Sequence, residues 1–299
     1  MRIGRVASVT DTGRRRLRNE DAYVCDPPLF AIADGMGGAQ AGEIASRLAA
    51  AAIAERERAL QGEAAVAELV QAANERVYRR AVEDPAAAGM GTTVTIALVG
   101  DDAGSVTIGH VGDSRAYRVR EESLEQLTAD HSLVAELVRT GRLTPEQAAE
   151  HPHRSVITRA VGTEPSVEVD TFTLETAPGD LYLLCSDGLT DMVDDAEILA
   201  IARASERRPD TVAQLLVEAA NRAGGNDNIT VVAFEVVEGE AEPEEPPAEH
   251  APATTDPTET PEAPVRRRGA GKGGRALALL GLLAVLVAAG LVIWWSIHR

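Results

Sequence analysis

Aspartates at the ends of apolar runs are the feature that most restricts how this chain can fold. In five places a short strand-like run begins or ends at an aspartate close to glycine or asparagine: Asp21, Asp34, Asp113, Asp187 and Asp227. Any one of them is an ordinary turn signal, because Asx side chains bond their own backbone and glycine permits positive φ. As a set at the ends of central strands, they would converge on one rim and repel one another.

Hard divalent cations would relieve that repulsion. Mg2+ and Mn2+ take oxygen ligands and keep several waters, which suits a rim of carboxylates. The six histidines are scattered, so no zinc site is indicated. The two cysteines, Cys25 and Cys185, lie far apart, and neither begins the C-x5-R loop of cysteine-based phosphatases. The aspartates therefore favour a site for Mg2+ or Mn2+.

The order of the elements predicts an α+β fold. Strands come in adjacent pairs and helices are set apart in pairs, which fits antiparallel sheets covered by helices better than a βαβ alternation. The strand-like runs are 29–33, 92–99, 105–111, 115–119, 180–185 and 228–237, and the helical patterns are 43–60, 63–82, 131–140, 194–205 and 210–223. With 44% hydrophobic residues, the chain can bury a full core without a staple.

Composition divides the chain into three zones. Residues 1–237 have globular patterning, whereas 238–264 hold nine acidic residues, seven prolines and no lysine or arginine. Such a stretch cannot bury enough apolar surface to fold. We therefore expect an acidic, proline-rich, disordered linker over 238–275 that ends in the basic segment RRRGAGKGGR. Residues 276–295 are twenty uncharged residues, the length of a transmembrane helix.

The charges predict how such an anchor is oriented. The arginine cluster at 266–275 favours the cytoplasmic side, and Trp294 and Trp295 suit the far interface. Met1–Asp21 is polar and arginine-rich, unlike a secretory signal. We expect a single-pass protein of the cell membrane with its globular domain in the cytoplasm. The net charge of −18 argues against nucleic acid as a partner.

The glycine-rich stretch ADGMGGAQAGEIAS (33–46) could instead cradle a nucleotide phosphate. A dinucleotide loop needs G-x-G-x-x-G, but the sixth residue counted from Gly35 is Gln40. A P-loop needs G-K-[ST], but the only lysine, Lys272, is followed by glycine. Both nucleotide patterns fail, which leaves the metal interpretation of Asp34.

Seven motifs in sequence resemble the metal-dependent protein phosphatases of the PPM, or type-2C, family, and most closely its bacterial branch. They are RLRNED (16–21), ADGMGG (33–38), GTT (91–93), VGDSRAY (111–117), DHSLV (130–134), SDGLTD (186–191) and GGNDNITV (224–231). The resemblance covers 1–237. It implies a four-layer α-β-β-α sandwich with a dinuclear metal centre between two antiparallel sheets.

The resemblance also assigns the main metal ligands. Asp34 would bridge two Mn2+ or Mg2+ ions, with the carbonyl of Gly35 on one of them, and Asp187 and Asp227 would hold the second. Two cations about 3.5–4 Å apart can share a hydroxide that attacks phosphorus in line. No phosphoenzyme is then needed, and therefore no nucleophilic side chain.

Other residues receive supporting roles by resemblance. Glu20 and Asp21 would act through metal-bound water, and Arg16 would grip the substrate phosphate because it has the R-x-x-N-E-D spacing. Asp113 and Asp187 would hold a third metal. Asp130, Asp191 and Ser155 match further third-metal positions, and Ser155 lies in a flap, Ala129–Gly162, that shapes substrate choice. Asp191 could instead cap the helix that begins near Asp194.

One position departs from eukaryotic relatives. They carry histidine two residues after the bridging aspartate, whereas this chain has Met36, as the bacterial branch does. Methionine cannot donate a proton, so the leaving group must receive one from metal-bound water or another group. His110 and His131 lie near motifs, but a lone histidine is more often structural.

The expected activity is hydrolysis of phosphoserine and phosphothreonine in proteins, including Ser/Thr protein kinases, by a monomeric catalytic domain. One alternative is a phosphatase dedicated to a single regulatory phosphoprotein, although the sensory modules common in such proteins are not visible. Another is a non-catalytic pseudophosphatase, which predicts missing metal ligands. The presence of Asp34, Gly35, Asp187 and Asp227 argues against it.

Overall fold

The computed structural model describes residues 1–37, 41–55 and 61–239. The chain divides into two units, Met1–Glu242 and Pro243–Arg299, and the second lies outside the described residues. The predicted transmembrane helix at 276–295 and nearly all of the predicted linker are therefore outside them as well. Among the helices of the described residues, none is both long enough and apolar enough to span a membrane.

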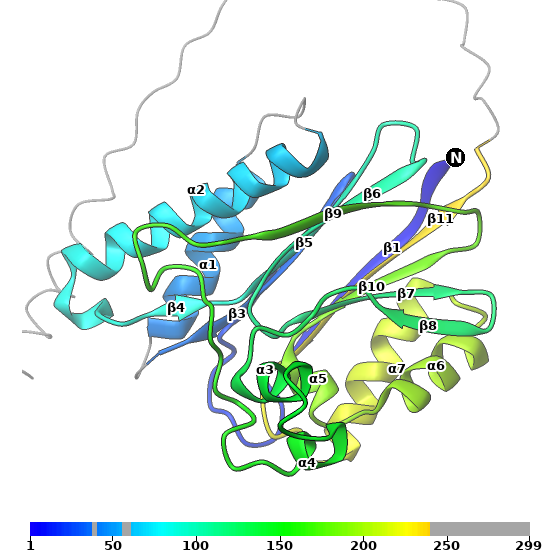
Figure 1. Cartoon of the computed structure of the whole chain (residues 1–299). Helices are drawn as coiled ribbons and strands as arrows, with labels where there is room; N and C mark the ends of the chain where they lie inside the picture. Colours follow the sequence, from blue (N-terminus) through cyan, green and yellow to red (C-terminus); the bar gives the residue numbers. More distant parts are fainter. Residues whose placement is uncertain (38–40, 56–60, 240–299) are drawn as a thin grey trace, which may run out of the picture. The chain divides into compact units, whose positions relative to one another are not determined.

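Two antiparallel sheets stack face to face in the first unit (Figure 1). The first sheet has the order β1-β11-β10-β7-β8, and the second has the order β2-β3-β5-β6-β9 with β4 paired to β3. The strands of the first sheet are β1 (Arg2–Asp11), β7 (Arg115–Arg120), β8 (Ser123–Gln126), β10 (Leu181–Cys185) and β11 (Ile229–Val237). Those of the second are β2 (Asp21–Asp26), β3 (Leu29–Met36), β4 (Gly91–Thr92), β5 (Val94–Val99), β6 (Ser105–Val111) and β9 (Asp170–Glu175).

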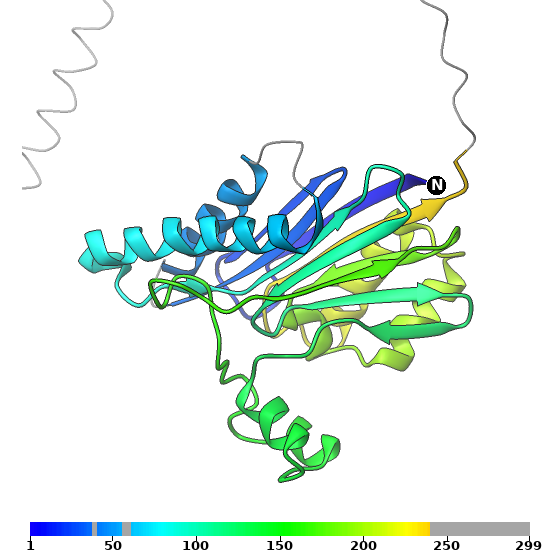
Figure 2. The same ribbon diagram turned by 45° about the horizontal axis from the view of Figure 1, so that its top comes forward.

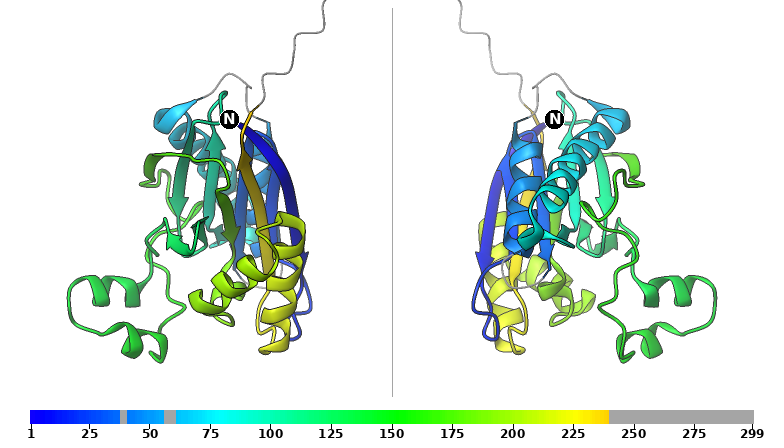
Figure 3. Two further views of the ribbon diagram at one scale, coloured as in Figure 1. Left: turned by 90° about the vertical axis from the view of Figure 1, so that its right-hand side faces the viewer. Right: turned by 90° about the vertical axis from the view of Figure 1, so that its left-hand side faces the viewer.

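Helices cover the outer face of each sheet and complete four layers. On the second sheet, α1 (Ala41–Ala54) packs against β2 and β3, and α2 (Gly62–Glu83) packs against β6. On the first sheet, α7 (Pro209–Arg222) packs against β1 and β11, with α6 (Asp195–Ala204) beside it. The end-on views in Figure 3 show this succession of layers. The predicted α+β class with two antiparallel sheets is confirmed.

Two short helices stand away from these layers. They are α3 (Leu133–Arg139) and α4 (Pro145–Ala149), the green helices that project from the sandwich in Figures 2 and 3. A third short helix, α5 (Asp187–Thr190), follows β10 directly. The segment 133–155 contains both helices and lies within the predicted flap. It is called the flap below.

The core has an inner part between the sheets and an outer part under each helix pair. Between the sheets the Phe30 and Phe234 rings stack with centroids 4.1 Å apart, and Tyr182 stacks on Phe234 at 5.0 Å. Because a central strand is covered on both faces, β3 begins as a continuous apolar run, Leu29–Ala33, that is wholly buried. Such runs are why the central strands could be found in the sequence.

The elements that were not predicted are short or lie at edges. β1 is an edge strand without a fully buried residue, so its sequence RIGRVASVTD shows little apolar periodicity. β8 and β9 are edge strands as well. The predicted strand 92–99 is interrupted at Thr93, and the predicted helix 43–60 ends at Ala54 in the described part.

Candidate active site

The sheet register brings the predicted aspartates to one end of the sandwich. Asp21 at the start of β2 lies directly opposite Asp34 near the end of β3. Asp187 follows the end of β10, and Asp227 precedes the start of β11. Because β10 and β11 are antiparallel neighbours, these two positions lie at the same end of the sheet. Like charges opposite one another destabilise a pair of strands, so the arrangement needs a compensating group.

Gly35 is required because three segments meet at its α-carbon. Its N–H donates to the carbonyl of Glu20 at 3.2 Å. A Cβ at this position would lie 2.1 Å from the carbonyl oxygen of Gly42 in α1, which is an impossible contact. Any side chain at position 35 would therefore push the turn before β2 or the start of α1 away from β3.

Burial and mutual repulsion make these carboxylates hard to ionise. The pKa values of Asp34 and Asp187 are raised well above the ordinary value, first by desolvation and then by neighbouring aspartates. Desolvation also raises the pKa of Asp21 and of Asp113 to about 6. A cluster of this kind is a functional-site signature, because a folded core gains nothing from unpaired acids.

Two hydroxyl groups orient Asp21, and sequence reasoning missed both. Ser186 Oγ and Thr230 Oγ1 donate to Asp21 Oδ2 at 2.9 and 2.6 Å. Both residues lie inside quoted motifs, next to Asp187 and close to Asp227, which was the only signal available. The other oxygen, Asp21 Oδ1, is buried and has no hydrogen-bond partner, and the same is true of Asp187 Oδ1.

These two orphan oxygens test whether a divalent cation fits. The donor set is all carboxylate oxygen, which hard cations prefer, and a cation would relieve both the unpaired oxygens and the raised pKa values. The residues therefore fit Mg2+ or Mn2+. Within 1–37, 41–55 and 61–239, no three Asp, Glu, His or Cys side chains already converge tightly enough to hold an ion.

Arg16 supplies part of the missing positive charge. Its Nη2 donates to Asp227 Oδ2 at 2.5 Å, and its Nη1 lies 4.0 Å from Glu20 Oε2. The predicted phosphate-binding arginine thus faces two predicted metal ligands. Its side chain is 49% exposed, so the guanidinium stands at the opening of the site.

Asn228 holds the loop that carries Arg16. Its Nδ2 donates to the carbonyls of Thr12 and Arg18, and its Oδ1 accepts the N–H of Glu20. A buried amide thus ties the loop between β1 and β2 to the start of β11, about two hundred residues away in sequence. The NDN motif was recognised, but nothing local in it indicates this role.

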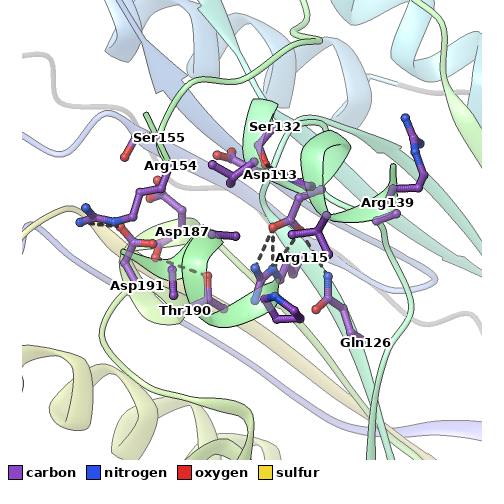
Figure 4. Close-up of a pocket in the computed structure, with 18 residues that line it drawn as sticks. Asp113, Arg115, Gln126, Ser132, Arg139, Arg154, Ser155, Asp187, Thr190 and Asp191 are labelled. Atoms are coloured by element: carbon purple, nitrogen blue, oxygen red, sulfur yellow. Dashed lines mark hydrogen bonds and ion pairs between the residues drawn. The ribbon is translucent and has the colours of Figure 1, made fainter. Parts of the chain in front are cut away.

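A hollow beside the aspartates is bounded by the flap (Figure 4). It has a volume of about 680 Å³ and is lined by Asp113, Asp187, Asp191 and Ser155, all candidate residues for a third metal. Ser155 is exposed at the edge of this lining. The structure therefore brings the three aspartates and the flap serine to one cavity.

Asp130 lies at the same cavity but already has a partner. Arg115 binds it with two nitrogens, Nε at 2.9 Å and Nη2 at 2.7 Å, and Gln126 adds a third contact at 3.2 Å. Asp191 is 3.9 Å from Arg154 of the flap. The cap of α6 is Asp194, whose side chain accepts the N–H of Glu197, so Asp191 does not serve as that cap.

The two histidines near the motifs are structural. His110 is buried, bonds Thr95 through Nδ1 at 2.9 Å, and has its pKa lowered to about 4 by desolvation. His131 Nδ1 accepts the N–H of Gly112 at 3.0 Å, and its Nε2 lies 3.1 Å from Asp170. Met36, at the end of β3, pairs with Gly91.

Comparison with known proteins agrees with this geometry. The chain matches the Protein phosphatase 2C family over residues 13–223. The serine/threonine phosphatase stp of Listeria innocua is 39% identical over 238 residues, which cover 76% of this chain and 93% of that protein. The chain belongs to the protein phosphatase 2C family.

Two further comparisons involve the phosphatase PstP. PstP of Mycobacterium tuberculosis is 38% identical over 322 aligned positions, which cover 99% of this chain and 62% of PstP, so the chain spans less than two thirds of that relative. The structure of a PstP catalytic domain in complex with two manganese ions has a TM-score of 0.72 and 39% identity. That match covers 79% of this chain and 99% of the domain.

Proposed function

We propose that this chain is a serine/threonine protein phosphatase that depends on Mn2+ or Mg2+ and reverses the action of protein kinases, including phosphorylation of the kinases themselves. The observation that carries the proposal is the set of aspartates at one end of a protein phosphatase 2C sandwich, two of which, Asp21 and Asp187, have a buried oxygen without a hydrogen-bond partner. Phosphoserine and phosphothreonine proteins are the substrates that its named relatives support.

The aspartates would hold the ions. Asp34, Asp187 and Asp227 are the principal ligands, with the carbonyl of Gly35, and Asp21 is oriented for the same task by Ser186 and Thr230. When bound, divalent cations lower the pKa of water and neutralise charge that develops on phosphoryl oxygens. Asp113 and Asp191, which line the cavity beside the flap, would hold a third ion. Asp130 is already hydrogen-bonded to Arg115.

Arg16 would bind the phosphate group. Its planar guanidinium has more N–H groups than its contact with Asp227 uses, and it is exposed at the opening of the site. Neither histidine near the motifs is free to protonate the leaving group, because His110 is buried and bonded, and His131 is held by Gly112 and Asp170. Met36 cannot take that role.

The decisive experiment measures phosphate release from a phosphothreonine peptide by the purified full chain with Mn2+. Activity should vanish with EDTA and should be lost in Asp34→Asn. Asp26→Asn is the matched control, because Asp26 lies at the far, exposed end of β2. This variant should retain full activity. Activity that survives EDTA, or equal activity in Asp34→Asn, would refute the metal-dependent mechanism.

We also propose that residues 276–295 anchor a monomeric catalytic domain to the cytoplasmic face of the cell membrane. The support is the run of twenty uncharged residues behind an arginine cluster. Protease added to spheroplasts should leave the domain intact until the membrane is permeabilised. Cleavage in sealed spheroplasts would reverse the orientation, and recovery in the soluble fraction would exclude the anchor.

A further inference from the structure

The hollow under the flap is lined by helices that have no core of their own. Neither α3 nor α4 contains a buried residue, although Val134 and Val138 of α3 and Ala148 of α4 are half-buried around the cavity. Apolar side chains that face a cavity of about 680 Å³ keep part of their surface in contact with water. The cavity size falls within the range of about 300–1,000 Å³ that ligand pockets occupy.

Two of the charged side chains that line the cavity neutralise each other. Arg115 and Asp130 both line the cavity and form a two-pronged ion pair, so neither presents a free charge to an occupant. The other two arginines that line the cavity, Arg139 and Arg154, are exposed to solvent. The hollow therefore combines an apolar flap side with the carboxylates of Asp113, Asp187 and Asp191 on the side of the candidate active site. Because these carboxylates repel a second phosphate, the free part of the hollow suits an apolar group better.

The cavity is continuous with the candidate active site. Asp113 and Asp187 belong both to its lining and to the acidic centre. A peptide whose phosphorylated residue sits at that centre advances about 3.3–3.6 Å per residue. Residues close to the phosphorylated one therefore pass the opening of the hollow, whichever way the peptide runs.

We propose that this hollow, the flap pocket, binds an apolar side chain of the phosphoprotein within three residues of the phosphoserine or phosphothreonine. The proposal rests on the proposed phosphatase activity and adds sequence selectivity to it. A hydrophobic pocket of this kind discriminates between substrates by about 10- to 200-fold. Phosphorylated segments with a large aliphatic neighbour are thus the preferred substrates.

The test uses the full chain with Mn2+ and a set of phosphothreonine peptides. Leucine replaces aspartate in turn at each of the three positions on either side of the phosphothreonine, and the ratio of the two kcat/KM values is measured at each position. The wild-type chain should show a ratio of about 10 or more at one position. Ratios near one at all six positions would overturn the flap pocket.

Two variants show whether the selectivity comes from the flap pocket. Ala148→Trp fills the hollow and Val138→Asp places a charge in it, so each should bring the leucine ratio close to one. The ratio is taken within one variant, so it cancels losses that affect every substrate. Glu146→Trp is the matched control, because Glu146 is exposed on α4 and does not line the cavity; its ratio should match wild type.

The outcomes separate this proposal from the proposed function. Hydrolysis of p-nitrophenyl phosphate, which has no flanking residues, reports the metal-dependent activity alone. If the wild-type chain hydrolyses neither this compound nor any of the peptides, the proposed phosphatase activity is contradicted. Hydrolysis of both with a leucine preference that persists in Ala148→Trp and Val138→Asp contradicts the flap pocket only.

Discussion

The two sides of the candidate active site are built in different ways. The sheet side carries Asp34, Asp187 and Asp227 on strand ends that are backed by helices such as α7, which buries seven residues. The flap side consists of α3 and α4, which bury none. Segments with few buried contacts open at low free energy, whereas the core opens only with global unfolding. We infer that the sheet side performs the chemistry and the flap side selects the substrate.

The largest expected effect concerns the sheet side. Asp187→Asn removes a ligand and a charge, so activity toward both p-nitrophenyl phosphate and phosphopeptides should fall by about 10³-fold, since metal-assisted charge stabilisation is worth several kcal/mol. Steady-state kinetics with Mn2+ measure it. Asp101→Asn, exposed in the turn between β5 and β6, should change nothing. A loss confined to peptides would assign Asp187 to substrate selection and break the comparison.

Stability should differ between the two sides as well. Leu216→Ala in α7 removes a fully buried side chain and should lower the free energy of unfolding by about 2–5 kcal/mol. Val138→Ala in α3 should lower it by less than about 1 kcal/mol, since this side chain is only half-buried. Urea unfolding followed by circular dichroism compares them. Equal losses would show that the flap shares the stability of the core.

Arg16 tests which side the loop between β1 and β2 belongs to. Arg16→Ala should lower kcat/KM by about 10- to 100-fold for small and peptide substrates alike, because a charge-assisted hydrogen bond contributes about 1.5–3 kcal/mol. Arg15→Ala, its exposed neighbour, is the control and should stay near wild type. If Arg16→Ala impaired only peptides, the loop would act with the flap in selecting substrates.

The smallest expected effect is a dependence of stability on pH. The folded state raises the pKa values of Asp21 and Asp113 to about 6, so it binds more protons than the unfolded chain between about pH 4 and 6. Without metal, the free energy of unfolding should therefore rise by about 1 kcal/mol as pH falls from 7 through 6, and Asp34→Asn should show a smaller rise.

Metal addition provides the complementary measurement. Mn2+ competes with protons for the same carboxylates, so it should raise Tm more at pH 7.5 than at pH 5.5. Differential scanning calorimetry with Mn2+ and with EDTA checks both effects. A Tm that responds to Mn2+ equally at the two pH values would separate the metal from these aspartates.

Sequence reasoning succeeded where the signal is local. The buried run of β3 and the turn residues around Asp34 and Asp187 indicated both the strands and the acidic positions at their ends. The stripes of α2 and α7 were found for the same reason, because one face of each is buried. β1, β8 and β9 were missed because edge strands have no fully covered face.

The flap shows a different kind of miss. The helical pattern at 131–140 was recognised as α3, whereas α4 was not predicted even though Thr144 and Gln147 form a capping box with Pro145 at the first position. That signal is local and could have been used. The absence of any core beneath α3 and α4 could not be foreseen, since burial depends on segments distant in the chain.

The sequence by itself determined the chemistry available to this protein. It contains the aspartates, the glycine of the close approach and the arginine-rich loop, and their motif order indicates the family. Only the tertiary structure decided how these groups are paired. Arg16 reaches Asp227 across 211 residues, Ser186 and Thr230 orient Asp21, and Arg115 engages Asp130. Such pairings depend on distances between side chains on separate strands, and a linear sequence does not contain those distances before the two sheets have stacked.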